Sequence, residues 1–108
     1  MEAKFEAAFL KALKKHASIK MLVKKKADMM LENPVAFGEP LKGNLQGFYS
    51  CPVKRTFIII YLYCKVCREK SDNVVVACAD CADTPDETVK FVLLGPHDDA
   101  YLGPVEKR

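Results

Sequence analysis

Four of the five cysteines are spaced as two C-x-x-C pairs, Cys64 with Cys67 and Cys78 with Cys81. A C-x-x-C turn can direct two thiolates at one ion, and zinc binds thiolate sulfur at about 2.3 Å in a tetrahedral shell. Ten residues separate the pairs, enough for a hairpin that brings the four sulfurs together. The spacing predicts one structural zinc ion with no ligand position left for water or substrate.

Two other kinds of chemistry use the same spacing. Four cysteines can also hold an iron-sulfur cluster. A thioredoxin-like redox pair would open a helix after a strand in a βαβ unit, and no such pattern surrounds Cys64. Cys51 stands apart and is predicted to be a small buried apolar residue. Four nearby acids are better explained as residues of a solvated loop than as metal ligands, because thiolates suit zinc better. These are Asp80, Asp83, Asp86 and Glu87.

The chain of 108 residues is half hydrophobic, which is enough for one compact domain spanning residues 1–108. No stretch approaches the roughly 20 apolar residues of a membrane helix. The N-terminus is amphipathic and does not have the pattern of a secretory signal. We therefore expect a cytoplasmic protein with no membrane contact, in a reducing compartment where cysteines serve metal or thiol chemistry rather than disulfides.

The net charge of +3 is unevenly distributed along the sequence. Residues 1–31 contain eight lysines against three acids, whereas residues 80–101 contain six acids against one lysine. This asymmetry would suit a polyanion on one face of the protein. From charge alone, two solvated surfaces are the simpler interpretation.

Hydrophobic spacing predicts two helices near the N-terminus. Apolar residues recur at helical spacing from Phe5 to His16 and again from Ile19 to Met30. Ser18 is placed to cap the second helix, and Asn33-Pro34 ends it because the residue before proline disfavours α geometry. We expect His16 to lie in the core or at an interface.

Strand signals follow a long loop over residues 33–47. Strands are predicted over residues 48–53, 57–63 and 88–94, with a brief strand or loop arm at 74–76. The run FIIIYLY at 57–63 is apolar throughout, as in a strand buried on both faces. These elements define an α+β fold: a helical hairpin on a small, mostly antiparallel, twisted sheet. A cysteine segment at about 64–87 is inserted between the last two strands.

Three motifs occur in order along the chain. LENPVAFGEPLKGNLQGFYS runs from Leu31 to Ser50, Ile60-Tyr61 lies in the following strand, and GPHDDAY closes the last strand. In order and spacing these motifs resemble the RelE/ParE superfamily of bacterial and archaeal toxins, in particular RelE/YafQ-like members with a cysteine-containing loop. The resemblance covers nearly the whole chain outside the cysteine segment.

The resemblance implies two helices on an antiparallel sheet, with a first edge strand that is short or absent within residues 1–5. It implies the toxin of a type II toxin-antitoxin system, a ribosome-dependent mRNA endoribonuclease (mRNA interferase) neutralised by a cognate antitoxin. The partners would be that antitoxin, the ribosome and mRNA, with DNA met only through the antitoxin. ParE-like members instead inhibit DNA gyrase. The alternative is therefore a non-enzymatic gyrase inhibitor, or an antitoxin-binding module that has lost nuclease activity.

His97 corresponds to the catalytic histidine of YafQ-like members. RNA cleavage without a metal needs a base for the 2′-OH proton and an acid for the leaving oxygen, roles that fit a histidine pKa near about 6.5. By the same resemblance Asp98 or Asp99 would orient His97, and Tyr101 would stack on a base. Without the resemblance, a histidine that caps a turn explains His97 better.

The family's usual cationic positions carry Pro52 and Ile58 in this chain. Lys54 and Arg55, in the turn before residue 57, are the nearest replacements as phosphate contacts, although exposed turn residues explain them equally well. Lys42 is a further candidate for the RNA backbone. We expect the metal to fix the strand that leads to His97, with catalysis in the cleft beside it. A third interpretation is a zinc-ribbon RNA- or protein-binding domain whose contact surface is the cysteine loop, with Lys65, Arg68 and Lys70.

Overall fold

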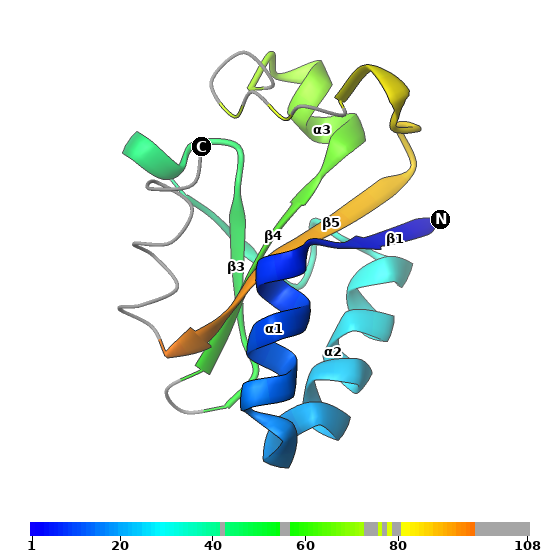
Figure 1. Ribbon diagram of the computed structural model, residues 1–108. Coiled ribbons are helices and arrows are strands. Elements are labelled where there is room, and N and C mark those ends of the chain that lie inside the picture. Colours follow the sequence, from blue (N-terminus) through cyan, green and yellow to red (C-terminus); the bar gives the residue numbers. More distant parts are fainter. Residues whose placement is uncertain (42, 55–56, 73–75, 77, 79–80, 97–108) are drawn as a thin grey trace.

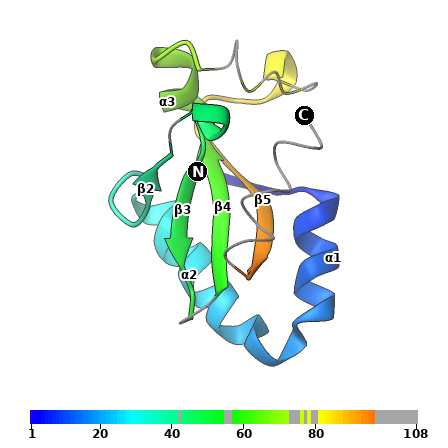
Figure 2. The same cartoon turned by 90° about the vertical axis from the view of Figure 1, so that its left-hand side faces the viewer.

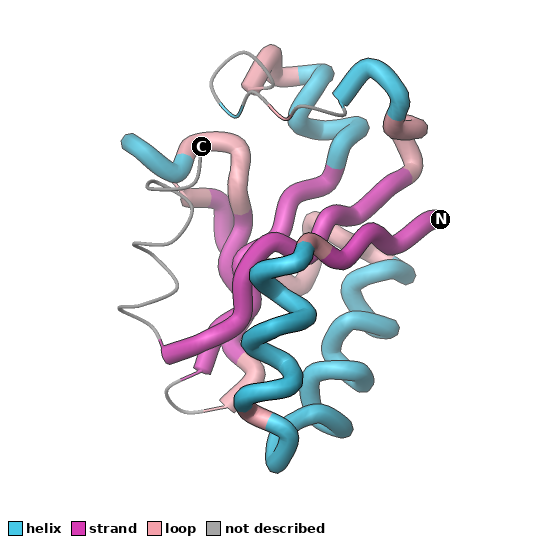
Figure 3. Tube along the Cα trace, in the orientation of Figure 1, coloured by secondary structure: helices cyan, strands magenta, loops and turns pink. Residues whose placement is uncertain are grey.

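The computed structural model describes residues 1–41, 43–54, 57–72, 76, 78 and 81–96 (Figure 1). Figure 3 distinguishes the helices, strands and loops of this part of the chain. The strands are β1 (Glu2–Phe5), β2 (Glu39–Pro40), β3 (Tyr49–Pro52), β4 (Phe57–Tyr63) and β5 (Thr88–Pro96). The helices are α1 (Ala7–Lys15), α2 (Lys20–Glu32) and α3 (Cys64–Glu69), with 3₁₀ turns η1 (Ala17–Ile19), η2 (Gly43–Leu45) and η3 (Cys81–Asp83).

The five strands form one sheet in the order β1-β5-β4-β3-β2. β1 runs parallel to β5, and every other neighbouring pair is antiparallel. The predicted α+β class and mostly antiparallel sheet are confirmed. The first edge strand, expected to be short or absent, is present as four residues paired with the start of β5.

Helices α1 and α2 run in opposite directions on one face of the sheet and meet at η1 (Figures 1 and 2). Their buried residues are Phe9 in α1 and Val23, Ala27 and Met30 in α2. The prediction that Ser18 caps α2 is wrong, because α2 begins at Lys20 and its N-terminal flank, Ile19, makes no side-chain cap. No helix in the described ranges is long and apolar enough to cross a bilayer.

Strand β4 lies at the centre of the sheet and is buried on both faces, as predicted. Ile59, Tyr61 and Tyr63 pack in the helix-side core, while alternate residues of the same strand pack in a second core on the opposite face. This second core contains Ile58, Ile60 and Leu62 together with Cys64, Cys67 and Val76. The cysteine segment therefore supplies part of the cover of the second face.

Strand β5 also places side chains in both cores, and a β-bulge interrupts its pairing with β4. Ile60 pairs with Leu93 but Tyr61 pairs with Phe91, so Val92 is the additional residue. β5 also extends past its predicted end, because Pro96 still pairs with Phe57. β1 pairs only with the start of β5, so a proline at the far end removes no hydrogen bond to a second neighbour.

Tyr61 fastens the long loop after α2 to the core. Its hydroxyl donates to the carbonyl oxygen of Pro34 at 2.7 Å, and its side chain is fully buried. Gly38 passes over the same ring, where an added Cβ would lie 2.8 Å from Tyr61 Cζ and closer still to the hydroxyl oxygen. The loop can take this path only because residue 38 has no side chain.

Gly38→Ala should therefore destabilise the protein by about 1–3 kcal/mol, the usual cost of overpacking a core. Urea denaturation followed by far-UV circular dichroism measures this change. Gly95→Ala is the matched control, because a Cβ there meets nothing within 4 Å. Equal stabilities of the two variants would contradict the proposed contact with Tyr61.

Candidate functional site

The four paired cysteines line one cavity on the second face of the sheet. Cys64 follows β4 directly and opens α3, and Cys67 lies one turn later; both are buried. Cys78 and Cys81 approach from the returning limb of the segment. The cavity measures about 10 Å³ and is completed by four further residues: Leu62, Arg68, Val76 and Lys90.

The four thiols share this cavity without forming a closed ligand shell. Within the described ranges, no three histidine, cysteine, aspartate or glutamate side chains are arranged to hold a metal ion. The donor set nevertheless fits zinc, because four thiolates complete a tetrahedral structural site. Metal binding and local folding are coupled, so thiols that line one cavity can close on an ion when it binds. The cavity is near the lower limit for one water molecule, which suits an ion bound without water.

The first cysteine pair has a local structure different from the predicted hairpin turn. Cys64 opens a helix after a strand, a placement also used by redox pairs, so the sequence-based reason for setting that chemistry aside was partly wrong. No βαβ unit follows, however, because β4 and β5 are antiparallel. Burial raises the pKa of Cys64, and burial together with Asp72 raises the pKa of Cys67 to about 11. A redox nucleophile needs the opposite shift.

Arg68 ties α3 to the returning limb. Its guanidinium donates to the backbone carbonyls of Cys81 and Thr84 and to the carboxylate of Asp86, and one nitrogen lies 3.8 Å from Cys81 Sγ. Its side chain is 26% exposed. The sequence suggested Arg68 only as a possible contact to RNA or to a protein partner, whereas in the structure Arg68 forms its hydrogen bonds inside the cysteine segment.

Glu87 makes a second, exposed link in the same region. Its carboxylate accepts a hydrogen bond from the hydroxyl of Tyr63 at 3.1 Å and lies 3.8 Å from the ammonium of Lys65. Asp86 and Glu87 were expected only as solvated loop residues, but Asp86 also binds Arg68 inside the segment, and Glu87 also binds Tyr63 at the end of β4. Cys51, predicted to be buried and apart, lies in the helix-side core.

Lys90 lines the cysteine cavity and was missed by the sequence analysis. It stands between Val89 and Phe91, which both face the helices, and so points to the opposite face. Its side chain is 1% exposed, which is unusual for lysine. The signal that could have identified it is a single charge inside the apolar run TVKFVLL.

The predicted catalytic residues lie outside the described residues, as do two of the three predicted RNA contacts. These are His97, Asp98, Asp99 and Tyr101, and Lys42 and Arg55. Lys54 is described, exposed, and located in the turn before β4, where its carbonyl accepts the Phe57 N–H at 3.2 Å. Phe57 also pairs with Pro96, so the described end of β5 lies beside the turn that carries Lys54.

The cysteine cavity and the end of β5 are far apart. Tyr63 pairs with Val89 next to α3, whereas Pro96 lies at the opposite end of the strand (Figure 1). A nine-residue strand spans about 26 Å. The cleft expected beside the strand that leads to His97 involves residues outside those that the structure describes, so it stays a prediction.

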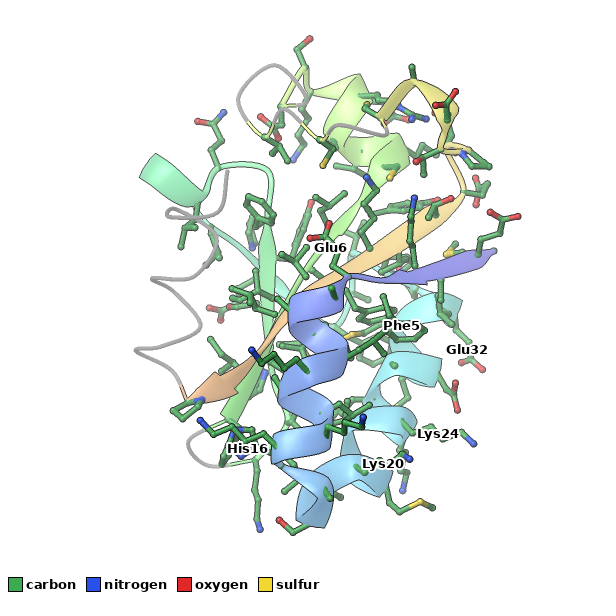
Figure 4. All side chains as sticks on the ribbon, viewed as in Figure 1. Phe5, Glu6, His16, Lys20, Lys24 and Glu32 are labelled. Carbon is green, nitrogen blue, oxygen red and sulfur yellow. The ribbon has the colours of Figure 1, made fainter. Side chains whose placement is uncertain are left out.

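A separate groove lies between α1 and α2. It measures about 230 Å³, and Phe5, Phe9 and Val23 contribute to its apolar floor. Lys20 and Lys24 stand at its edge, and both are exposed (Figure 4). His16 follows the C-terminal end of α1, and its ring makes an edge contact with the ring of Phe57, with ring centroids 4.7 Å apart.

Comparison with known proteins places the fold. No protein-family model matches the sequence, and no curated protein matches it. A YoeB/ParE toxin from Agrobacterium tumefaciens superposes with a TM-score of 0.65 over 90% of this chain and 99% of its own, at 12% identity. YafQ from E. coli has a TM-score of 0.59 over 91% and 94%, at 15% identity. A metal-bound toxin from Helicobacter pylori has a TM-score of 0.57 over 92% and 97%, at 24% identity. The chain has the fold of these toxins.

The raised pKa values of Cys64 and Cys67 predict slow thiol chemistry in metal-free protein. At pH 8 almost all of the Cys67 thiol is protonated, and its reaction with iodoacetamide should speed up roughly tenfold per pH unit towards pH 11. Peptide mass spectrometry measures each cysteine separately, and the protein unfolded in urea gives the reference rates. Rapid alkylation of Cys64 or Cys67 at pH 7 would indicate a redox pair instead.

Proposed function

We propose that this protein is the toxin of a toxin-antitoxin pair, acting in the cytoplasm as a ribosome-dependent mRNA endoribonuclease. The observation that carries the proposal is the fold, which the chain shares over nine-tenths of its length with a YoeB/ParE toxin and with YafQ. The motifs that led to the same family from sequence lie in the loop after α2, in β4, and at the end of β5.

In this proposal His97 is the general acid or base, oriented by Asp98 or Asp99, and Tyr101 stacks on a base of the substrate. Its support in the described residues is the position of Pro96, the residue bonded to His97. Pro96 pairs with Phe57, next to the turn that contains Lys54. A cation at this turn can balance a phosphate in the reaction, with Arg55 and Lys42 as the further contacts.

The groove between α1 and α2 fits a protein partner. Its apolar floor would accept the apolar face of an antitoxin segment. Lys20 and Lys24, which outnumber the one acid of its lining, Asp28, would attract acidic side chains. Most of the lysines of residues 1–31 are exposed on these helices, so the same surface could otherwise approach ribosomal RNA. An antitoxin on this surface would compete with that approach.

One observation favours a second function, a ParE-like gyrase inhibitor or an antitoxin-binding module without nuclease activity. Ile58, at a position where related nucleases carry a phosphate-binding arginine, is only 8% exposed. Pro52, its partner on β3, also lacks a charge. A nuclease of this kind would depend on Lys54, Arg55 and Lys42 for its phosphate contacts.

Cys64, Cys67, Cys78 and Cys81 would hold one structural zinc ion. Zinc would close the segment that joins β4 to β5 and complete the cover of the second core. The metal-bound toxin among the similar structures supports metal binding on this fold without specifying the ion. An iron-sulfur cluster would use the same thiolates, but it would colour the purified protein, whereas zinc would not.

Expression of the wild-type chain in bacteria should arrest growth, and co-expression of a protein encoded next to it should restore growth. His97→Ala should relieve the arrest and reduce cleavage of translated mRNA by about 10²–10⁴-fold, because the acid or base of the reaction is lost. Primer extension measures the cleavage. His16→Gln is the matched control, since it alters the only other histidine.

Unchanged cleavage by the His97→Ala variant would remove His97 from the mechanism. Growth arrest without mRNA cleavage, together with inhibition of DNA supercoiling by purified gyrase, would establish the second function instead.

Purified protein should contain close to one zinc per chain by elemental analysis. Zinc at a hundredfold excess over its Kd should stabilise the fold by about 2.7 kcal/mol, measured against chelator-treated protein in urea. Cys64→Ser and Cys81→Ser should lower the zinc content, whereas Cys51→Ala, which changes the cysteine on the other face, should keep it. A metal-free protein of unchanged stability would contradict the site.

A further inference from the structure

Helix α3 ends in a backbone cap that carries Asp72. The N–H of Asp72 donates to the carbonyl oxygen of Cys67 at 2.8 Å, and the N–H of Ser71 donates to that of Arg68 at 3.1 Å. Ser71 has a φ of 60°, so these hydrogen bonds and the left-handed residue together form a Schellman motif. The place of Asp72 is therefore set by the backbone of Cys67, one of the four candidate metal ligands.

The side chain of Asp72 reaches a loop from another part of the chain. It is 8% exposed, and its carboxylate accepts a hydrogen bond from the side-chain amide of Gln46 at 3.0 Å. Gln46 belongs to residues 41–48, here called the η2 loop, which contain η2 and lie between β2 and β3. The two residues are 26 positions apart, so only the fold brings them together.

The backbone of the η2 loop packs directly on the cysteine segment at Gly47. A Cβ on Gly47 would lie 2.6 Å from Cγ2 of Val76 and 3.1 Å from Cβ of Asp72. Gly47 also has a φ of 96°, in the region that favours glycine. The loop and the segment therefore fit together only because residue 47 has no side chain.

The same two segments share one hydrophobic core. Phe48 is 3% exposed and packs on the second face of the sheet, in the cluster that contains Cys64 and Cys67. Leu41 and Leu45 are partly buried against this cluster. Because protein interiors are closely packed, a shift of the cysteine segment must be accommodated by the η2 loop.

We propose that Asp72 and Gln46 are positioning residues through which a metal ion bound by the cysteines orders the η2 loop. An ion held by Cys67 would fix the end of α3, and the cap would then fix Asp72. The hydrogen bond to Gln46 and the contact at Gly47 would transmit this order to the loop, since metal binding and folding of the surrounding chain are coupled. This inference rests on the proposed metal site. It gives the ion a second effect, on the loop that contains Lys42, a predicted RNA contact outside the described residues.

Zinc should slow amide hydrogen exchange in the η2 loop of the full chain. The reporters are the backbone amides of Leu41, Gln46 and Phe48, whose N–H groups donate to carbonyls within the loop. With zinc at about a hundred times its Kd, exchange should be at least about tenfold slower than with a chelator, and about a hundredfold is the limit set by binding to the folded form. The amide of Ala36, bonded to the carbonyl of Asn33 before β2, is the internal reference and should change little.

Gln46→Met removes the amide and keeps an unbranched side chain of similar length. Coupling between two sites is reciprocal, so this variant should bind zinc about fivefold more weakly or worse, and zinc should no longer slow exchange in the loop. Competition with a chromophoric chelator measures the affinity. Glu39→Met is the matched control, because it makes the same kind of change at an exposed position in β2, just before the loop. Its zinc affinity and loop exchange should match the wild type.

Gly47→Ala tests the same coupling through packing. Its Cβ would displace the loop from Val76, so zinc should lose its effect on the loop amides. Zinc should still slow exchange of the Lys70 amide, which donates to the carbonyl of Val66 in α3.

A hydrogen bond that serves stability alone predicts a different result. Gln46→Met would then lower stability equally with and without zinc, and would leave zinc affinity and the zinc-dependent exchange of the loop unchanged. That result, or wild-type loop amides that exchange at the same rate with and without bound zinc, would overturn the inference while leaving the metal site intact. A wild-type chain that binds no zinc would overturn the metal site and this inference with it.

Discussion

The antiparallel pairing of β4 with β5 is the constraint on which the rest of the structure depends. These two strands form the middle of the sheet, and each side chain of β4 from Ile58 to Tyr63 enters one of the two cores. An extra residue at Val92 keeps β5 in step with this two-sided burial. Because the two strands are paired along their length, a segment attached to one end of the pair is held at a fixed distance from the opposite end.

The length of these strands separates the cysteine connection from the end of β5. The connection between the strands, which carries the cysteines, lies at the end of the sheet next to Tyr63 and Val89. The end of β5 and the turn with Lys54 lie at the opposite end. A metal ion bound by the connection would act on the far end by holding β4 and β5 in register, since direct contact is excluded by the length of the strand.

Much of this architecture could be predicted from the sequence, because it follows from local patterns. The apolar run from Phe57 to Tyr63 indicated a central strand, and the helical spacing before Asn33 indicated two helices on one face. The strand boundaries were less accurate at Pro96, since a proline is tolerated where β1 no longer pairs. Ser18 was a plausible cap, but η1 and the buried Ile19 determined where α2 begins.

The sequence by itself determined the class of fold, the two cysteine pairs and the order of the motifs along the chain, because periodicity and spacing are properties of neighbouring residues. Only the tertiary structure decided what surrounds the cysteines. Cys64 and Cys67 became the first turn of a helix, Arg68 turned inward, and Lys90 joined their cavity from a strand more than twenty residues away. Such a partnership depends on which residues β4 and β5 align across the sheet, and neither strand's sequence specifies that alignment alone.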